Sequence, residues 1–167
     1  MKKIIILWLS IGYLSGCIPR KDDILTTNYT PVLMERAAME AAVRTEPPRT
    51  LVNTGKLYKY REYLFISELF EGIHVINNAN PLLPKKIGFI RIPGCVDMAV
   101  KDGYLYADNA TDLITFNLNN PENPTMVHRV KDVFPELLPP DHNMADIPSS
   151  YSKNERPENT VIVKWQR

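Results

Sequence analysis

Four side chains in the middle of the sequence are candidates for ligand binding. His74 stands in an apolar run, and its imidazole could bind a ligand or form one local hydrogen bond inside the fold. Asp97, Asp108 and Asp112 follow, and carboxylates that converge at one end of a β-unit could hold Ca²⁺. The segment from Asp108 to Asp112 lacks the ordered oxygen spacing of a calcium loop. Turn capping is therefore the favoured role of these carboxylates, and packing is the favoured role of His74.

The sequence carries no pattern typical of a metal centre, a cofactor site or a catalytic triad. It has neither a Cys/His metal spacing nor a glycine-rich phosphate loop. Asp141 and His142 lie in a proline-rich stretch with no Ser or Cys nearby that could act as a nucleophile. We therefore expect no cofactor, no metal and no enzymatic activity.

The charge balance argues against nucleic acid as a partner. The 167 residues include 20 Lys and Arg and 19 Asp and Glu, for a formal net charge of +1. No basic stripe is present of the kind that binds a phosphate backbone. The two cysteines, Cys17 and Cys95, are not expected to form a disulfide, because Cys17 lies in an N-terminal motif that predicts modification of its thiol.

The N-terminus has the pattern of a secretory signal. Two lysines precede an apolar run over residues 4–14, which is too short to span a membrane as a helix. Ser15, Gly16 and Cys17 then resemble the bacterial lipobox. The resemblance implies that residues 1–16 are a lipoprotein signal peptide and that Cys17 becomes the lipidated first residue. The alternative is an ordinary signal peptide followed by an unmodified cysteine.

Residues 17–28 are expected to form a lipidated flexible tether, since they lack hydrophobic periodicity. Within them, Lys21, Asp22 and Asp23 resemble the surface-export signal of Bacteroidetes lipoproteins. That resemblance implies an outer-membrane lipoprotein, exposed at the cell surface and joined to the membrane through its lipid anchor. The alternative is a solvated, charged tether without an export role.

The rest of the chain is organised by a repeat of about forty residues. Gly72–Asn77 precedes an Asn-Pro-x-x-Pro turn at residues 80–84, and Asp112–Asn117 precedes the same turn at residues 120–124. Such a period of short strands and Asn/Pro turns is typical of a β-propeller blade. Each repeat is predicted to contain four strands, at residues 56–60, 63–67, 72–77 and 85–92 and at residues 96–101, 104–108, 113–118 and 125–130.

Three segments flank the repeats. Residues 30–43 are predicted to form one helix, with Thr30 as the cap and Pro31 in the first turn. Residues 135–159 are predicted to form a long loop. Residues 160–167 contain a third copy of the repeat strand, in an incomplete repeat.

The repeat strands and the segment from Ile92 to Lys101 resemble the LVIVD-repeat β-propeller lipoproteins of Bacteroidetes. The resemblance covers residues 29–134 and, more loosely, residues 160–165. It implies an exported lipoprotein that carries a propeller, and it implies no established enzymatic activity. Relatives are longer than this chain, which therefore resembles the N-terminal part of such a protein.

The predicted fold is mostly β: a partial β-propeller of about two to two and a half four-stranded antiparallel blades, with one short N-terminal helix. Its open strand edges could mediate self-association. The predicted function is that of an envelope lipoprotein whose repeat module binds or scaffolds a protein or glycan ligand. The alternatives are a truncated remnant of a longer propeller lipoprotein and an enzyme that uses a propeller cleft.

Overall fold

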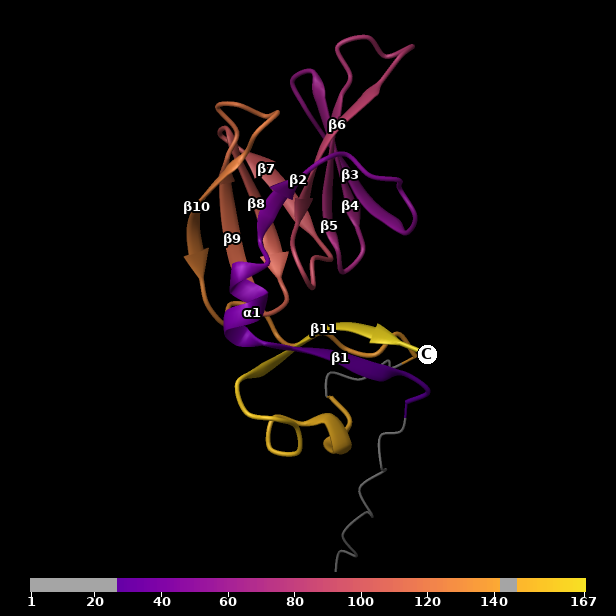
Figure 1. Ribbon diagram of the computed structural model, residues 1–167, viewed down its shortest axis with the longest axis vertical. Helices are drawn as coiled ribbons and strands as arrows, with labels where there is room; N and C mark the ends of the chain where they lie inside the picture. The colour runs from indigo at the N-terminus through magenta and orange to yellow at the C-terminus, as the bar shows by residue number, and fades with distance from the viewer. Residues whose placement is uncertain (1–26, 142–146) are drawn as a thin grey trace, which may run out of the picture.

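The computed structural model describes residues 27–141 and 147–167, and it is built mainly of β-strands in three antiparallel sheets (Figure 1). The predicted lipid-attachment residue Cys17 and the predicted export residues Lys21, Asp22 and Asp23 lie outside these ranges.

The first repeat forms a five-stranded sheet in the order β2-β6-β5-β4-β3. Strands β3 to β6 follow one another along the chain as a meander, and β2 adds to the free edge of β6. The strands are β2 (Arg44–Glu46), β3 (Thr54–Tyr60), β4 (Tyr63–Glu68), β5 (Gly72–Asn77) and β6 (Lys85–Arg91).

The second repeat forms a four-stranded sheet in the order β10-β9-β8-β7. Its strands are β7 (Met98–Lys101), β8 (Tyr104–Asn109), β9 (Asp112–Asn117) and β10 (Thr125–Val130). The two repeats also make the same turn. Asn77 Oδ1 accepts a hydrogen bond from Ala79 N at 2.9 Å, and Asn117 Oδ1 accepts one from Asn119 N at 2.7 Å. The prediction of a mostly β chain with four antiparallel strands per repeat is confirmed, although no closed sheet is present among the described residues.

The two ends of the described chain form a third sheet, which the sequence patterns do not predict. Strand β1 (Thr30–Glu35) pairs antiparallel with β11 (Thr160–Gln166). The predicted helix over residues 30–43 is therefore wrong in its first half, because α1 is confined to Arg36–Ala41. The residues before α1 satisfy their backbone groups across the sheet instead of within a helix, so a tertiary contact overrides local propensity.

The C-terminal segments also differ in part from their predictions. The strand predicted at residues 160–167 exists as β11, but its partner is β1 and it does not begin a third four-stranded unit. Within the described part of the predicted 135–159 loop, one short 3₁₀ turn, η1, spans Ser149–Tyr151.

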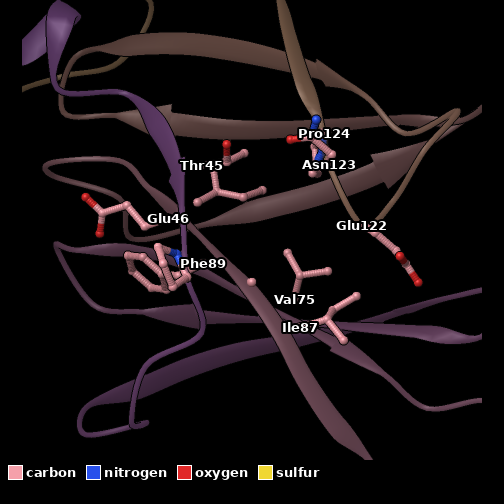
Figure 2. Close-up of a pocket in the computed structure, with 11 residues that line it drawn as sticks. Thr45, Glu46, Val75, Ile87, Phe89, Glu122, Asn123 and Pro124 are labelled. Atoms are coloured by element: carbon pink, nitrogen blue, oxygen red, sulfur yellow. The ribbon is translucent and has the colours of Figure 1, made fainter.

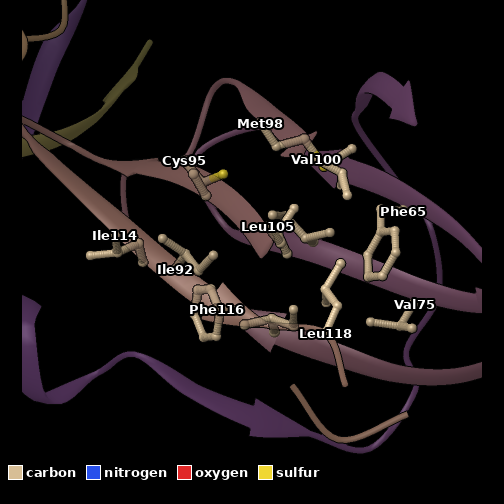
Figure 3. Close-up of a cluster of buried hydrophobic side chains, with 13 residues drawn as sticks. Phe65, Val75, Ile92, Cys95, Met98, Val100, Leu105, Ile114, Phe116 and Leu118 are labelled. Carbon is tan, nitrogen blue, oxygen red and sulfur yellow. The ribbon is translucent and has the colours of Figure 1, made fainter. Parts of the chain in front are cut away.

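The main core lies between the sheets of the two repeats, which pack face to face (Figure 3). Phe65, Val75 and Ile90 of the first sheet meet Leu105 and Phe116 of the second, and all of them are buried. A smaller cluster around Met39 and Val161 joins α1 to the third sheet. Apolar burial across one interface therefore holds the two repeats together.

No helix among the described residues is long and apolar enough to cross a membrane.

Gly72 provides a test of how β5 and β6 meet. Its φ is +143°, and a Cβ at this position would lie 2.0 Å from the carbonyl oxygen of Ile90. We expect Gly72→Ala to lower the free energy of unfolding by about 3 kcal/mol, because it adds both backbone strain and a clash. Urea denaturation measures the change. Gly88→Ala is the matched control, since its Cβ would make only ordinary contacts at 3.8 Å or more, and an equal loss in both variants would contradict the account.

Candidate functional site

Asp97 and Asp108 lie together at the entrance to β7. Asp108 Oδ1 accepts hydrogen bonds from the backbone N–H groups of Val96 at 2.8 Å and Asp97 at 2.9 Å. Asp97 Oδ1 accepts from Met98 N at 2.6 Å and from Lys56 Nζ at 2.7 Å. Burial raises the pKa of Asp108 above its ordinary value, against the opposing effect of these backbone donors. Both carboxylates therefore fasten the start of the second repeat.

Cys95 lies beside this pair and is fully buried. Burial, followed by the negative charge of Asp108, raises the pKa of its thiol well above the ordinary value. Its Sγ lies 3.8 Å from the carbonyl oxygen of Asp97 and donates a weak hydrogen bond to it. The thiol is therefore protonated and packs as a small apolar group.

The two aspartates line an open groove of about 530 Å³. Its floor is the outer face of the second sheet, and its other wall is the segment of residues 134–138. The wall is held in place, because Trp165 Nε1 donates to the carbonyl oxygen of Leu137 at 2.9 Å and Phe134 N donates to that of Thr111 at 2.9 Å. The lining is mainly apolar; its side chains include those of Ala99, Tyr106, Ala107, Ala110, Leu113, Phe134 and Leu138.

His74 lies away from this groove, on the far face of the first sheet. Its ring is fully buried, and Nε2 lies 3.0 Å from Glu68 Oε2. The ring packs edge-on against Phe89 at a centroid distance of 4.8 Å, and the Arg49 guanidinium covers Phe89. The structure thus places His74 in a packed environment with one local hydrogen bond.

Glu68, the partner of His74, also fastens the chain before its own repeat. Its carboxylate accepts from Val52 N at 3.0 Å and from Asn53 N by a short hydrogen bond. Burial raises the pKa of Glu68, but the hydrogen bonds from Val52, Asn53 and His74 outweigh burial and hold the pKa below its ordinary value.

Asp112 is buried in a network of two arginines. Its Oδ1 accepts from Arg36 Nη2 at 2.5 Å, and its Oδ2 accepts from Arg129 Nη1 at 2.6 Å. The backbone N–H of Asp132 adds a third hydrogen bond at 3.1 Å. Arg36 comes from α1 and Arg129 from β10, so this carboxylate ties the N-terminal part of the described chain to the second repeat.

The structure therefore brings together only part of the predicted set. Asp97 and Asp108 meet at the groove, whereas Asp112 is engaged by arginines and His74 packs in the first sheet. Within residues 27–141 and 147–167, no group of three or more His, Cys, Asp or Glu side chains could hold a metal ion.

Other residues of this region were not predicted from the sequence. Lys56 and Arg36 pair with aspartates far along the chain, and nothing local in the sequence predicts those pairs. The groove wall at residues 134–138 was predicted mostly as loop. A usable signal was present, since its apolar residues Phe134, Leu137 and Leu138 are unusual for a solvated loop.

A second, smaller hollow of about 340 Å³ lies between the two repeats (Figure 2). Val75 and Ile87 line it from the first sheet, and Asn123 and Pro124 line it from the turn between β9 and β10. Glu46, at its other side, is paired with Arg44 at 2.5 Å. The groove beside β7 is larger and more apolar, so it is the stronger candidate for a binding site.

No protein-family model, curated protein or solved structure matches the chain.

The burial of Asp112 yields a prediction about stability. Asp112→Asn removes the charge and leaves two largely buried guanidinium groups without their shared anionic partner, so we expect the free energy of unfolding to fall by about 3 kcal/mol. Asp132→Asn is the matched control, because Asp132 also pairs with Arg36 but has a side chain that is 66% exposed; we expect a loss below about 1 kcal/mol. Urea denaturation of both variants at neutral pH measures the difference, and equal losses would disprove a central role for Asp112.

Proposed function

We propose that this chain is a lipid-anchored envelope protein whose repeat domain binds a protein partner through the groove beside β7. Two features of the sequence support the anchor: the lipobox-like Cys17 and the resemblance to LVIVD-repeat β-propeller lipoproteins of Bacteroidetes. The three charged residues Lys21, Asp22 and Asp23 support display at the cell surface. In this proposal residues 17–28 are the tether between the membrane and β1.

The observation that carries the binding role is the exposed apolar surface around the groove. Val130 is 41% exposed, Phe134 is 39% exposed and Leu138 is 37% exposed. Apolar side chains that gather beside a groove are typical of protein-interaction sites. Burying each of them against a partner would contribute about 1 to 2 kcal/mol.

The polar groups of the groove favour a protein ligand over a glycan and favour binding over catalysis. A glycan needs several free hydrogen-bonding groups, but Lys56 and Asp97 are paired with each other. Asp108 Oδ1 is occupied by two backbone donors. These groups support the fold, and the rest of the lining is mainly apolar.

Metabolic labelling with radioactive palmitate tests the anchor. We expect the full chain to be labelled and the Cys17→Ala variant to lose the label, because the thiol of Cys17 is the proposed acceptor. Cys95→Ala controls for the second cysteine and is expected to keep the label. Label that persists in Cys17→Ala would rule out the proposed anchor.

Photo-cross-linking in intact cells tests the binding face. A photoreactive residue at Val130 or Leu138 should yield a covalent adduct with a protein chain, because Leu138 lines the groove and Val130 is the strand partner of Leu113, which lines it. The same residue at Leu82, which is 89% exposed on the turn between β5 and β6, is the control and should yield no such adduct. The binding role is excluded if Val130 and Leu138 give no protein adduct, or if Leu82 gives the same adduct.

A further inference from the structure

The two repeats are stacked in the same orientation. The interface between them therefore consists of opposite faces of the two equivalent sheets. We call the face that contains Phe65, Ile73 and Ile90 in the first sheet the front face, and the opposite face, with Leu57 and Ile66, the back face. The main core consists of the front face of the first sheet and the back face of the second. This is head-to-tail packing between two copies of one unit.

The repeat register identifies the equivalent residues. When Tyr63 is aligned with Tyr104, Phe65 corresponds to Tyr106. When Pro84 is aligned with Pro124, Ile90 corresponds to Val130. Cross-strand pairing places Tyr106 and Val130 on one face. Val130 lies opposite Leu113, and Leu113 lies opposite Asp108. Asp108 follows Tyr106 by two residues in β8 and so shares its face, as does Ala99, which lies opposite Tyr106.

The front face of the second sheet is therefore the counterpart of a buried face, but it is itself partly exposed. Ile90 is completely buried between the repeats, whereas its counterpart Val130 is 41% exposed. Phe65 is likewise completely buried, whereas its counterpart Tyr106 is only partly buried and lines the groove.

The back face of the first sheet is the complementary half. Leu57 corresponds to Met98, which is 3% exposed at the internal interface, yet Leu57 is itself 55% exposed. Leu64 and Ile66, next to it on this face, are half-buried, although the counterpart of Leu64 is the fully buried Leu105. Residues 49–53 cover the part of the face around Phe89 and Glu68.

We propose that the partner at the groove is a second copy of this chain, which stacks head-to-tail. The front face of the second sheet of one copy would receive the back face of the first sheet of the next copy, around Leu57. This inference rests on the proposed binding role of the groove and names its partner.

A second copy fits because the contact would continue an interface that the chain already makes internally. The internal interface joins a front face to a back face through apolar side chains, and the same pairing of faces would join two copies. Each copy carries one face of each kind that the other sheet of the same copy does not cover, so the contact is heterologous and extends to further copies unless rotation closes a ring. A front-to-front dimer would instead leave Leu57 outside the interface.

Sedimentation velocity of the purified full chain over a range of concentrations tests the proposal. We expect wild type to self-associate, and we expect Val130→Asp on the front face and Leu57→Asp on the back face each to weaken association about tenfold or more, because each introduces a charge into an apolar contact. Leu82→Asp is the matched control on an exposed turn and should associate like wild type. Thermal unfolding verifies that each variant is folded, and Val130→Ser and Leu57→Ser replace any variant that is not.

Mixing the two variants distinguishes the arrangements. Val130→Asp keeps an intact back face and Leu57→Asp keeps an intact front face, so an equimolar mixture should form a dimer and nothing larger. The proposal is overturned if wild type stays monomeric, if Leu57→Asp associates like wild type, or if the mixture stays monomeric. Mass spectrometry of the Val130 cross-link distinguishes the binding role of the groove from the identity of its partner. If the adduct contains only a different protein, the binding role stands and the second copy is excluded as the partner.

Discussion

The structure depends on the burial of one sheet face against another. Phe65 and Ile90 of the first repeat are removed from water by Leu105 and Phe116 of the second, within the main hydrophobic core. The polar contacts across this interface are few and specific. Tyr58 donates from its hydroxyl to the carbonyl oxygen of Val100 at 2.9 Å, and Lys56 pairs with Asp97, so they fix the offset of the two sheets.

Polar side chains have a different task, which is to hold the segments that lead into the sheets. Glu68 binds the backbone before β3, and Asp108 binds the backbone before β7, at similar places in the two repeats. Asp112 does the same on a larger scale, because Arg36 brings α1 and the third sheet to the second repeat. The carboxylates that suggested a ligand site thus mainly accept hydrogen bonds from backbone and arginine donors, and so hold segments of the chain in place.

Local patterns predicted the repeats well, and long-range pairing limited the rest. The bounds of β5 and β10 agree with the predicted strands at residues 72–77 and 125–130, since apolar runs and Asn/Pro turns are local signals. The predicted helix at residues 30–43 was too long because β11 supplies strand partners from the other end of the chain. At the site, the proximity of Asp97 and Asp108 was predicted, but the arginines around Asp112 were not. Arg36 lies 76 residues and Arg129 lies 17 residues from Asp112, and neither ion pair leaves a trace in the local sequence.

The pairing of β1 with β11 has a consequence for the order of folding. Thr30 lies opposite Gln166, so β1 is made early in synthesis and its partner is among the last residues described. The two repeats can close by contacts between neighbouring strands, which form quickly, whereas the β1–β11 pair must close a loop that contains both of them. We therefore expect β1 to remain an unpaired strand until β11 has been synthesised, and the third sheet to form after the two repeats.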